Sequence, residues 1–341
     1  MRIQKYLQTL FFTGLFAVTG AFAQVKTVYY VTNYGAKGDG KAFDTKSINA
    51  AIDAAANAGG GTVYFPAGNY LSGSIHLKSN ISLYLDQGAT IIAADYVPEA
   101  GYDAPEMAVT NKFEDFGHRH WHNSLIWGEN IHDVSILGPG KIWGKGLERT
   151  NTIDKMNDET NPKPNKSIAL LNCRNIIIRD ISILHGGWFG LLATGADNLT
   201  VDNVKMDTNR DGMDIDCCQN VRISNCFINS PMDDGICLKS SYSLNKNRAT
   251  ENVTITNCQV SGFEEGSFLD GTYKRVAKDE GGPTGRIKFG TESNGGFKNI
   301  TISNCVFVYC RGLALETVDG ALLEDVTITN ITMREIVNAP I

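Results

Sequence analysis

Short runs of alternating apolar and polar residues recur along this 341-residue chain. Each run opens with an asparagine or aspartate and continues with β-branched or aliphatic residues at alternate positions, which is typical of strands. The runs start at residues 175, 198, 220, 252, 299 and 325, so the intervals are 23, 22, 32, 47 and 26 residues. We interpret the interval of 47 as two turns. A period near 23 that tolerates insertions indicates a solenoid. We therefore predict an all-β fold, a right-handed parallel β-helix.

A second ladder is made of glycines that each open a small-plus-apolar run: Gly190, Gly212, Gly235, Gly266, Gly290 and Gly312. Three consecutive glycines follow a carboxylate directly, namely Asp211, Asp234 and Glu265. Like charges one strand apart repel each other, so stability gains nothing from such a column. We interpret the column as an active site.

The N-terminal part shows elements outside the repeat. Residues 45–58 form an amphipathic pattern that ends in three glycines, and we predict a short helix that caps the open end of the solenoid. Residues 95–122 and 149–166 lack the period and are predicted to be long lateral loops. The chain stops directly after a strand turn, so we expect that further turns and a C-terminal cap are missing from it.

The first 23 residues have the three parts of a secretory signal peptide. Arg2 and Lys5 give a positive start, an apolar stretch follows, and a small-x-small site ends at Ala23. We predict cleavage after Ala23, a secreted or periplasmic location, and one β-helical catalytic domain over residues 24–341.

Charge and cysteine spacing narrow the function further. The net charge of −6 argues against nucleic acid and anionic membranes as partners, and we expect a monomer. Four cysteines each follow an asparagine, which predicts a buried stack rather than disulfides: Cys173, Cys226, Cys258 and Cys305. No cysteine spacing resembles a zinc site, and we predict neither a metal nor a cofactor. The Asn-Xaa-Ser/Thr triplets at 198, 252 and 299 are interpreted as turn ladders rather than glycosylation sites.

The carboxylates have the composition of an acid–base site. Neighbouring turns lie about 4.8 Å apart, so Asp211, Asp233 and Asp234 should crowd one surface beside Arg286 and Lys288. Crowded carboxyl groups push their pKa values apart, which leaves one group protonated and another ionised. Hydrolysis of a glycosidic bond needs such a pair. The two cations would bind a carboxylate of the substrate.

Three ordered motifs carry a family resemblance. They are Asn209–Asp214 (Asn-Arg-Asp-Gly-Met-Asp), Asp233–Ile236 (Asp-Asp-Gly-Ile) and Arg286–Lys288 (Arg-Ile-Lys). Together they resemble the signatures of glycoside hydrolase family 28, the polygalacturonases and related pectin hydrolases. The resemblance implies a right-handed parallel β-helix that cleaves galacturonic-acid-containing chains with inversion and without a metal.

The resemblance also implies roles for individual residues. Asp233 would be the general acid, Asp211 and Asp234 would hold the water, Arg286 and Lys288 would grip the uronate, and Asn209 would line the cleft. The family's Gly-His-Gly motif is absent, since no histidine follows His185. Glu265 is expected to take the place of that histidine in the column and to contact the substrate. This departure favours a rhamnogalacturonan or substituted-galacturonan hydrolase over a typical endo-polygalacturonase.

Two other classes of function remain open. The first is a polysaccharide lyase on the same solenoid, in which the acidic cluster binds Ca²⁺ and Arg286 acts as the base. The second is a carbohydrate-binding solenoid without turnover. The first would be sensitive to chelators and would release an unsaturated product, whereas the second would bind a polysaccharide and leave it intact.

Overall fold

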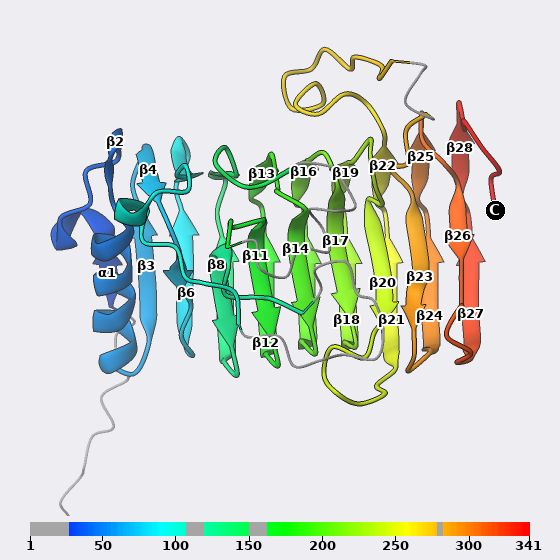
Figure 1. Cartoon of the computed structure of the whole chain (residues 1–341), viewed down its shortest axis with the longest axis horizontal. Helices are drawn as coiled ribbons and strands as arrows, with labels where there is room; N and C mark the ends of the chain where they lie inside the picture. Colours follow the sequence, from blue (N-terminus) through cyan, green and yellow to red (C-terminus); the bar gives the residue numbers. More distant parts are fainter. Residues whose placement is uncertain (1–26, 107–118, 150–161, 278–281) are drawn as a thin grey trace, which may run out of the picture.

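The structure is a computed structural model that describes residues 27–106, 119–149, 162–277 and 282–341. The expected signal peptide lies outside these residues, as do parts of both expected lateral loops. In the described part, nearly all regular structure is parallel strand (Figure 1). The predicted β-helix is confirmed.

Three parallel sheets, named A, B and C, run along the solenoid. Each regular turn adds one strand to sheet C, then one to sheet A and then one to sheet B. Sheet A contains β1 (Val28–Tyr30), β3 (Gly61–Phe65), β6 (Ile81–Leu85), β9 (His132–Leu137), β12 (Arg174–Arg179), β15 (Asp197–Asp202), β18 (Gln219–Ser224), β21 (Thr250–Thr256), β24 (Phe297–Ser303) and β27 (Leu323–Thr329). Sheet B contains β2 (Asp39–Phe43), β4 (Gly68–Ser72), β7 (Ala89–Ala93), β10 (Lys141–Trp143), β13 (Ser182–Leu184), β16 (Lys205–Asp207), β19 (Phe227–Asn229), β22 (Gln259–Ser261), β25 (Val306–Val308) and β28 (Thr332–Arg334). Sheet C contains β5 (Ile75–His76), β8 (Ser124–Glu129), β11 (Lys166–Leu171), β14 (Phe189–Thr194), β17 (Asp211–Asp216), β20 (Ile236–Ser240), β23 (Ile287–Ser293) and β26 (Leu313–Leu315).

The predicted capping helix is present as α1 (Thr45–Asn57), which lies against the first turns in Figure 1. Ile48, Ala51, Ile52 and Ala55 recur at helical spacing and are buried, so one apolar face covers the end of the core. Two short 3₁₀ helices, η1 (Val31–Tyr34) and η2 (Pro98–Ala100), complete the N-terminal part. Among the described residues, no helix has the length and apolar character that crossing a membrane requires.

The asparagine ladder forms as predicted along the start of the sheet A strands. Asn175, Asn198, Asn252 and Asn299 have positive φ angles, which asparagine tolerates better than most residues. Their amides bond from turn to turn, with Nδ2 of Asn198 3.0 Å from Oδ1 of Asn175 and Nδ2 of Asn299 2.7 Å from Oδ1 of Asn252. The triplets at 198, 252 and 299 therefore serve as turn ladders in this fold.

The cysteines are buried and free, which agrees with the stacking prediction. Its phase was wrong for one of them. Cys226, Cys258 and Cys305 occupy successive corners between sheets A and B, whereas Cys173 lies at the corner between sheets C and A. Both corners use an asparagine with positive φ, so the sequence pattern is the same at two different places in the turn.

The interval of 47 residues is one turn and not two. Strand β21 pairs directly with β24, with Val253 opposite Ile300. The additional residues leave the solenoid between β22 and β23 as a long loop, the gold segment at the top of Figure 1. In that view the loop leans back over β16 and β19, and the rings of Phe268 and Phe227 stack at 3.7 Å.

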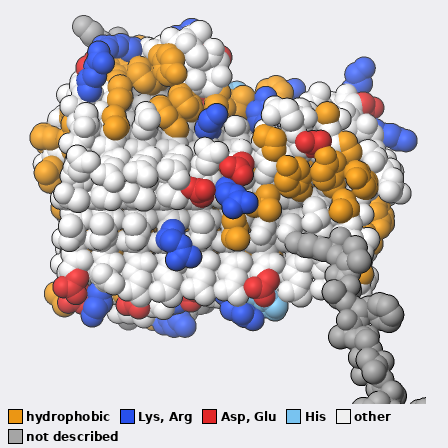
Figure 2. Space-filling model, turned by 180° about the vertical axis from the view of Figure 1, so that it is seen from behind, with side chains coloured by type: hydrophobic (Ala, Val, Ile, Leu, Met, Phe, Trp, Pro, Cys, Tyr) orange, Lys and Arg blue, Asp and Glu red, His pale blue; other side chains and the backbone are white. Residues whose placement is uncertain are grey.

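The face seen from behind in Figure 2 shows acidic and basic side chains interspersed rather than gathered by sign. The inner faces of the sheets supply the long core that runs through the turns. Sheet C is covered on its outer face as well, where Trp121, Trp188, Phe189 and Leu192 form a second apolar cluster. A sheet buried on both faces can carry charged side chains with little contact to water, and the candidate site lies at the start of these strands.

Candidate active site

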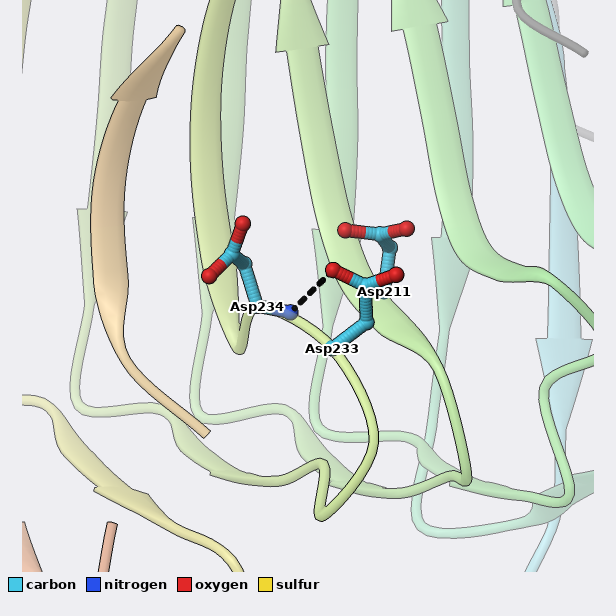
Figure 3. Close-up of side chains that lie close together, drawn as sticks. All are labelled: Asp211, Asp233 and Asp234. Carbon is cyan, nitrogen blue, oxygen red and sulfur yellow. Dashed lines mark hydrogen bonds between the residues drawn. The ribbon is translucent and has the colours of Figure 1, made fainter. Parts of the chain in front are cut away.

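The three predicted aspartates meet in one place. Asp211 begins β17, and Asp233 and Asp234 end the turn that leads into β20. Met213 pairs with Ile236, so Asp211 and Asp234 occupy the same column on adjacent turns. Each aspartate contributes an oxygen to a group whose members all lie within 4.8 Å of one another, and Figure 3 shows the side chains gathered together. The backbone N–H of Asp234 also donates to Oδ1 of Asp233 at 3.0 Å.

Glycines allow the turns to approach this closely. A Cβ atom on Gly212 would lie 2.4 Å from the carbonyl oxygen of Gly235, and one on Gly190 would lie 2.7 Å from that of Gly212. The predicted glycine column is therefore correct at 190, 212, 235 and 312. The position between Gly235 and Gly312 is Arg286, because Ile236 pairs with Ile287 and Ile287 pairs with Leu313.

Glu265 is not in the aspartate column, and this part of the prediction was wrong. Gly266 lies in the long loop between β22 and β23, and Gly290 lies inside β23, so neither belongs to the ladder. The regular spacing arose because the loop happens to be about one period long. Oε2 of Glu265 instead lies 3.2 Å from Nη1 of Arg149. Burial raises the pKa of Glu265 to about 7, although Arg149 opposes the rise.

Arg286 and Lys288 reach the aspartates as predicted. Nε of Arg286 donates to Oδ1 of Asp234 at 2.6 Å, and Nζ of Lys288 lies 3.5 Å from Oδ2 of the same carboxylate. Glu316 lies 3.7 Å from Arg286 and 3.6 Å from Lys288. The two cations thus share the carboxylates of Asp234 and the half-buried Glu316.

Arg210 contacts the cluster directly, which the sequence-based reasoning missed. Its Nη2 lies 2.8 Å from Oδ2 of Asp233 and 3.7 Å from Oδ2 of Asp211. The guanidinium also lies over the ring of Trp188, 5.7 Å from the centroid. The available signal was its position one residue before Asp211, in the column that contains Trp188 and Asp233.

The ion pair between Arg210 and Asp233 makes the pKa values of the aspartates differ from one another. Burial raises the pKa of Asp211 well above its usual value, and the neighbouring Asp214 and Asp233 add to the rise. Burial alone would also raise the pKa of Asp233, but Arg210, Lys239 and Lys288 together outweigh it, so that pKa is lowered. Burial raises the pKa of Asp234 against the opposing effect of Lys288. Asp211 therefore binds a proton more readily than Asp233 does.

A buried charge network lies beneath the aspartates. Nζ of Lys239 is 2.7 Å from Oε2 of Glu292 and 3.9 Å from Oδ2 of Asp214, on adjacent strands of sheet C. All three side chains are less than 10% exposed. Lys239 therefore places a positive charge under Asp211, where it limits the mutual repulsion of the carboxylates. The sequence analysis did not identify this network, because the burial of both faces of sheet C depends on the packing of other segments.

Asn209 lies in the turn that leads into β17, next to the backbone of Arg149. Its Nδ2 donates to the backbone oxygen of Arg149 at 3.4 Å, and its own backbone oxygen accepts from Met232 at 2.9 Å. Asn209 therefore links the turn of Asp211 to the turn of Asp233 and to Arg149. That Asn209 lines the cleft stays a prediction.

The aspartates are also the group of described side chains arranged closely enough to hold a metal ion. Arg210, Arg286 and Lys288 already place positive charge against all three carboxylates. A site with this many cations offers little gain to a divalent ion, whose preferred ligands are unpaired oxygens.

Comparisons with known proteins agree with this fold. A family model described as "Rhamnogalacturonase A/epimerase, pectate lyase-like" matches residues 28–125, and one described as "Right handed beta helix region" matches residues 148–272. A probable polygalacturonase of Vitis vinifera is 26% identical over 314 residues, covering 85% of this chain and 61% of its own length. An exo-poly-alpha-D-galacturonosidase of Dickeya chrysanthemi is 27% identical over 264 residues, covering 64% and 43%.

A solved structure extends the comparison to three dimensions. The hyperthermoactive exopolygalacturonase of Thermotoga maritima superposes with a TM-score of 0.67 at 19% identity, over 91% of this chain and 76% of that one. At this identity the likeness shows the fold. The chain spans less than two thirds of the length of the two sequence relatives. The chain is a right-handed parallel β-helix protein whose sequence is similar to those of polygalacturonases.

Proposed function

We propose that this protein is a secreted glycoside hydrolase that cleaves glycosidic bonds in pectic polysaccharide containing galacturonic acid. The observation that carries the proposal is the group of three aspartates whose oxygens lie within 4.8 Å of one another, with the pKa of Asp211 raised and that of Asp233 lowered. General acid–base hydrolysis of a glycoside needs that division. Arg286 and Lys288 beside the group suit the carboxylate of a uronate. The signal-like residues 1–23 support secretion.

Asp233 is proposed to deliver the proton to the leaving oxygen. Its side chain is 31% exposed, against 7% for Asp211 and 2% for Asp234, so it is the aspartate most open to a ligand. Arg210 keeps it ionised in the free protein. A substrate carboxylate that binds Arg210 would weaken the contact of Arg210 with Asp233, and the pKa of Asp233 would then rise because only Lys239 and Lys288 would still oppose the effect of burial.

The proton on Asp211 would then move to Asp233, since the two carboxylates belong to one close cluster. Asp211 becomes ionised in that step and can, together with Asp234, activate a water molecule. The bond from the sugar to the leaving oxygen breaks as Asp233 protonates that oxygen. The attacking water gives its proton to the aspartates, which restores the single proton of the site. Substrate binding would thus convert the resting charge arrangement into the catalytic one.

We propose inversion at the anomeric carbon, as the family resemblance implies. The short separation of the carboxylates taken alone would suggest retention, for which the two groups lie about 5–5.5 Å apart. With two carboxylates holding one water, the distance between one pair does not decide the outcome. Proton NMR of the first product formed from a pectic oligosaccharide distinguishes the two anomers, and retention would refute the water-holding role of Asp211 and Asp234.

The test of the function is turnover on a panel of pectic oligosaccharides, measured as new reducing ends. Asp233→Asn should lower kcat by about 10²–10⁴-fold and leave the cooperative thermal unfolding of the protein in place. Activity close to wild type would remove Asp233 as the acid. An unsaturated product that absorbs in the ultraviolet and vanishes with chelator would instead support a lyase, and binding without any product would support a carbohydrate-binding solenoid.

A further inference from the structure

Ser230 lies in the turn between β19 and β20, three residues before Asp233, and its side chain is fully buried. The hydroxyl oxygen of Ser230 lies 2.5 Å from the backbone oxygen of Arg210 and 3.1 Å from that of Asp233. Arg210 belongs to the turn that leads into β17, directly before Asp211. One buried hydroxyl group therefore contacts the backbones of both turns that carry the aspartates. The proposed mechanism makes no use of it.

The two residues that this hydroxyl group bridges are also joined through their side chains. Nη2 of Arg210 donates to Oδ2 of Asp233 at 2.8 Å. Backbone and side-chain contacts thus close a ring between the two turns. Holding a long arginine side chain in one orientation costs conformational entropy, and a fixed backbone at both ends limits what else can move. The length of the ion pair therefore depends on the distance that the hydroxyl group keeps between the two backbones.

Backbone hydrogen bonds connect the same two turns on either side of the bridge. The oxygen of Asn209 accepts from the N–H of Met232 at 2.9 Å, and the oxygen of Asp234 accepts from the N–H of Gly212 at 2.9 Å. Between these two bonds, the hydroxyl group of Ser230 supplies the donor for the carbonyl that follows Asn209. It completes the row of hydrogen bonds along the contact between the turns.

The bridge is shielded from water. Ser230 is 0% exposed and Arg210 is 5% exposed. A buried carbonyl group that loses its donor cannot regain one from solvent, so the loss is felt in full. The turn of Arg210 would have to move to find another partner, and Asp211 would move with it. A misplacement of about 1 Å at a catalytic group can lower a rate by about 10²-fold.

We propose that Ser230 is a positioning residue of the candidate active site. Its hydroxyl group ties the backbone of Arg210 to that of Asp233, which fixes the distance between Asp211 and Asp233 and keeps the guanidinium of Arg210 on the carboxylate of Asp233. Ser230 acts through these residues, because its burial keeps it from touching a ligand. Its effect on turnover rests on the proposed hydrolase function, whereas its effect on the ion pair does not.

The variant Ser230→Ala removes the bridge. We expect kcat on a pectic oligosaccharide to fall about 10²-fold and KM to change less, since the charged side chains of the site all remain. The alkaline limb of kcat/KM against pH should move upward by about half a unit, because a less well placed guanidinium favours the ionised form of Asp233 less strongly. A hydroxyl group that only stabilised the fold would leave this limb in place.

Ser240→Ala is the matched control. Ser240 is also 0% exposed and donates to a backbone oxygen, that of Arg248 at 2.8 Å. It lies at the end of β20, whereas the aspartates precede the start of this strand. The kcat, KM and pH profile of Ser240→Ala should therefore equal those of the wild type.

Unfolding in urea tests the bridge without a substrate. The pKa of Asp233 is lowered, so its ionised form stabilises the fold at pH 7, and part of this contribution is lost as the pH falls towards 3. A weakened ion pair should therefore lower the urea midpoint of Ser230→Ala more at pH 7 than at pH 3, whereas Ser240→Ala should lower it equally at both. The other charged groups around Asp233 are unchanged in both variants: Asp211, Asp234, Lys239 and Lys288.

A wild-type kcat in Ser230→Ala, or a lowered kcat with an unchanged pH profile and an equal loss of stability at both pH values, overturns the inference while the hydrolase function stands. If the wild type cleaves no pectic oligosaccharide, the proposed function is refuted, and the unfolding comparison alone decides whether the bridge holds the ion pair. If Ser230→Ala does not fold, Ser230→Cys is measured in the same way, since a thiol group is a weaker donor of similar shape. A lowered kcat with a raised alkaline limb would support the inference, and wild-type values would overturn it.

Discussion

Replacing Arg210 by glutamine should move the pH at which the protein loses its catalytic proton. Arg210 and Asp233 are in contact at 2.8 Å, which corresponds to about 6 kcal/mol of gross attraction at an effective dielectric constant of about 20. The net effect is smaller, because the Asp233 side chain is 31% exposed and other cations remain nearby. Measured shifts from one adjacent opposite charge are about 1–3 pH units, and the exposure of Asp233 points to the lower half of that range.

The direction of the shift follows from the charge. Loss of the cation favours the protonated form of the aspartate pair, so the pair keeps its proton to higher pH. The alkaline limb of kcat/KM against pH, which reports the free enzyme, should therefore move upward by about 1–2 units in Arg210→Gln. KM for a uronate substrate should rise as well, because Arg210 is the proposed partner that a substrate carboxylate takes over.

Arg210→Lys is the matched control. It keeps a positive charge near Asp233, so the alkaline limb should stay close to its wild-type position, whereas the weaker fit of an ammonium to a carboxylate should still raise KM. The assay is the full pH profile of each variant after circular dichroism has shown that it is folded. A profile of Arg210→Gln that superposes on the wild type, with an unchanged KM, would refute both the control of Asp233 by Arg210 and the proposed handover to the substrate.

Three further predictions concern the stability of the site. Asp211→Asn should stabilise the protein at pH 7–8 and have little effect near pH 3, because burial raises the folded-state pKa of Asp211 and its ionised form opposes folding above that pKa. The expected gain in the free energy of unfolding, measured with urea at both pH values, is about 1.4 kcal/mol for each unit by which the pKa is raised. Equal effects at both pH values would contradict the raised pKa of Asp211. Lys239→Met leaves Asp214 without its buried cation and should lower the free energy of unfolding by about 3–5 kcal/mol, so a loss below 1 kcal/mol would show that the network is not stabilising. Gly212→Ala, whose Cβ would lie 2.4 Å from a carbonyl oxygen, should cost about 1–3 kcal/mol in thermal unfolding, whereas Gly235→Ala, with nearest contacts at 3.4 Å, should cost less than half as much; equal losses would show that the turns relax freely.

The sequence by itself determined the repeating fold. Asn220, Asn252 and Asn299 occupy the same place near the start of the sheet A strands on successive turns. A residue that tolerates positive φ, followed by alternating apolar residues, indicates the start of a strand at each of these places. The neighbourhood of Asp211, Asp233 and Asp234 followed from the same period, because residues one turn apart must be adjacent in a solenoid. Arg286 and Lys288 were also found from sequence, but through their motif and not through the glycine ladder, which had placed Gly290 in the column of Gly235 where Arg286 lies, four positions earlier in the chain.

Where the period is interrupted, the path of the chain is known only from the folded structure. A spacing of 47 residues fits two turns or one turn with a long loop equally well, and the pairing of Val253 with Ile300 selects the second. As a consequence, Glu265 does not belong to the aspartate column and instead forms an ion pair with Arg149. The pairing of Arg210 with Asp233 likewise depends on the direction that a long side chain takes once Trp188 lies beneath it. Periodicity fixes where a backbone position lies along a solenoid, whereas the partner of a flexible charged side chain is set by packing between turns, which the order of residues does not encode locally.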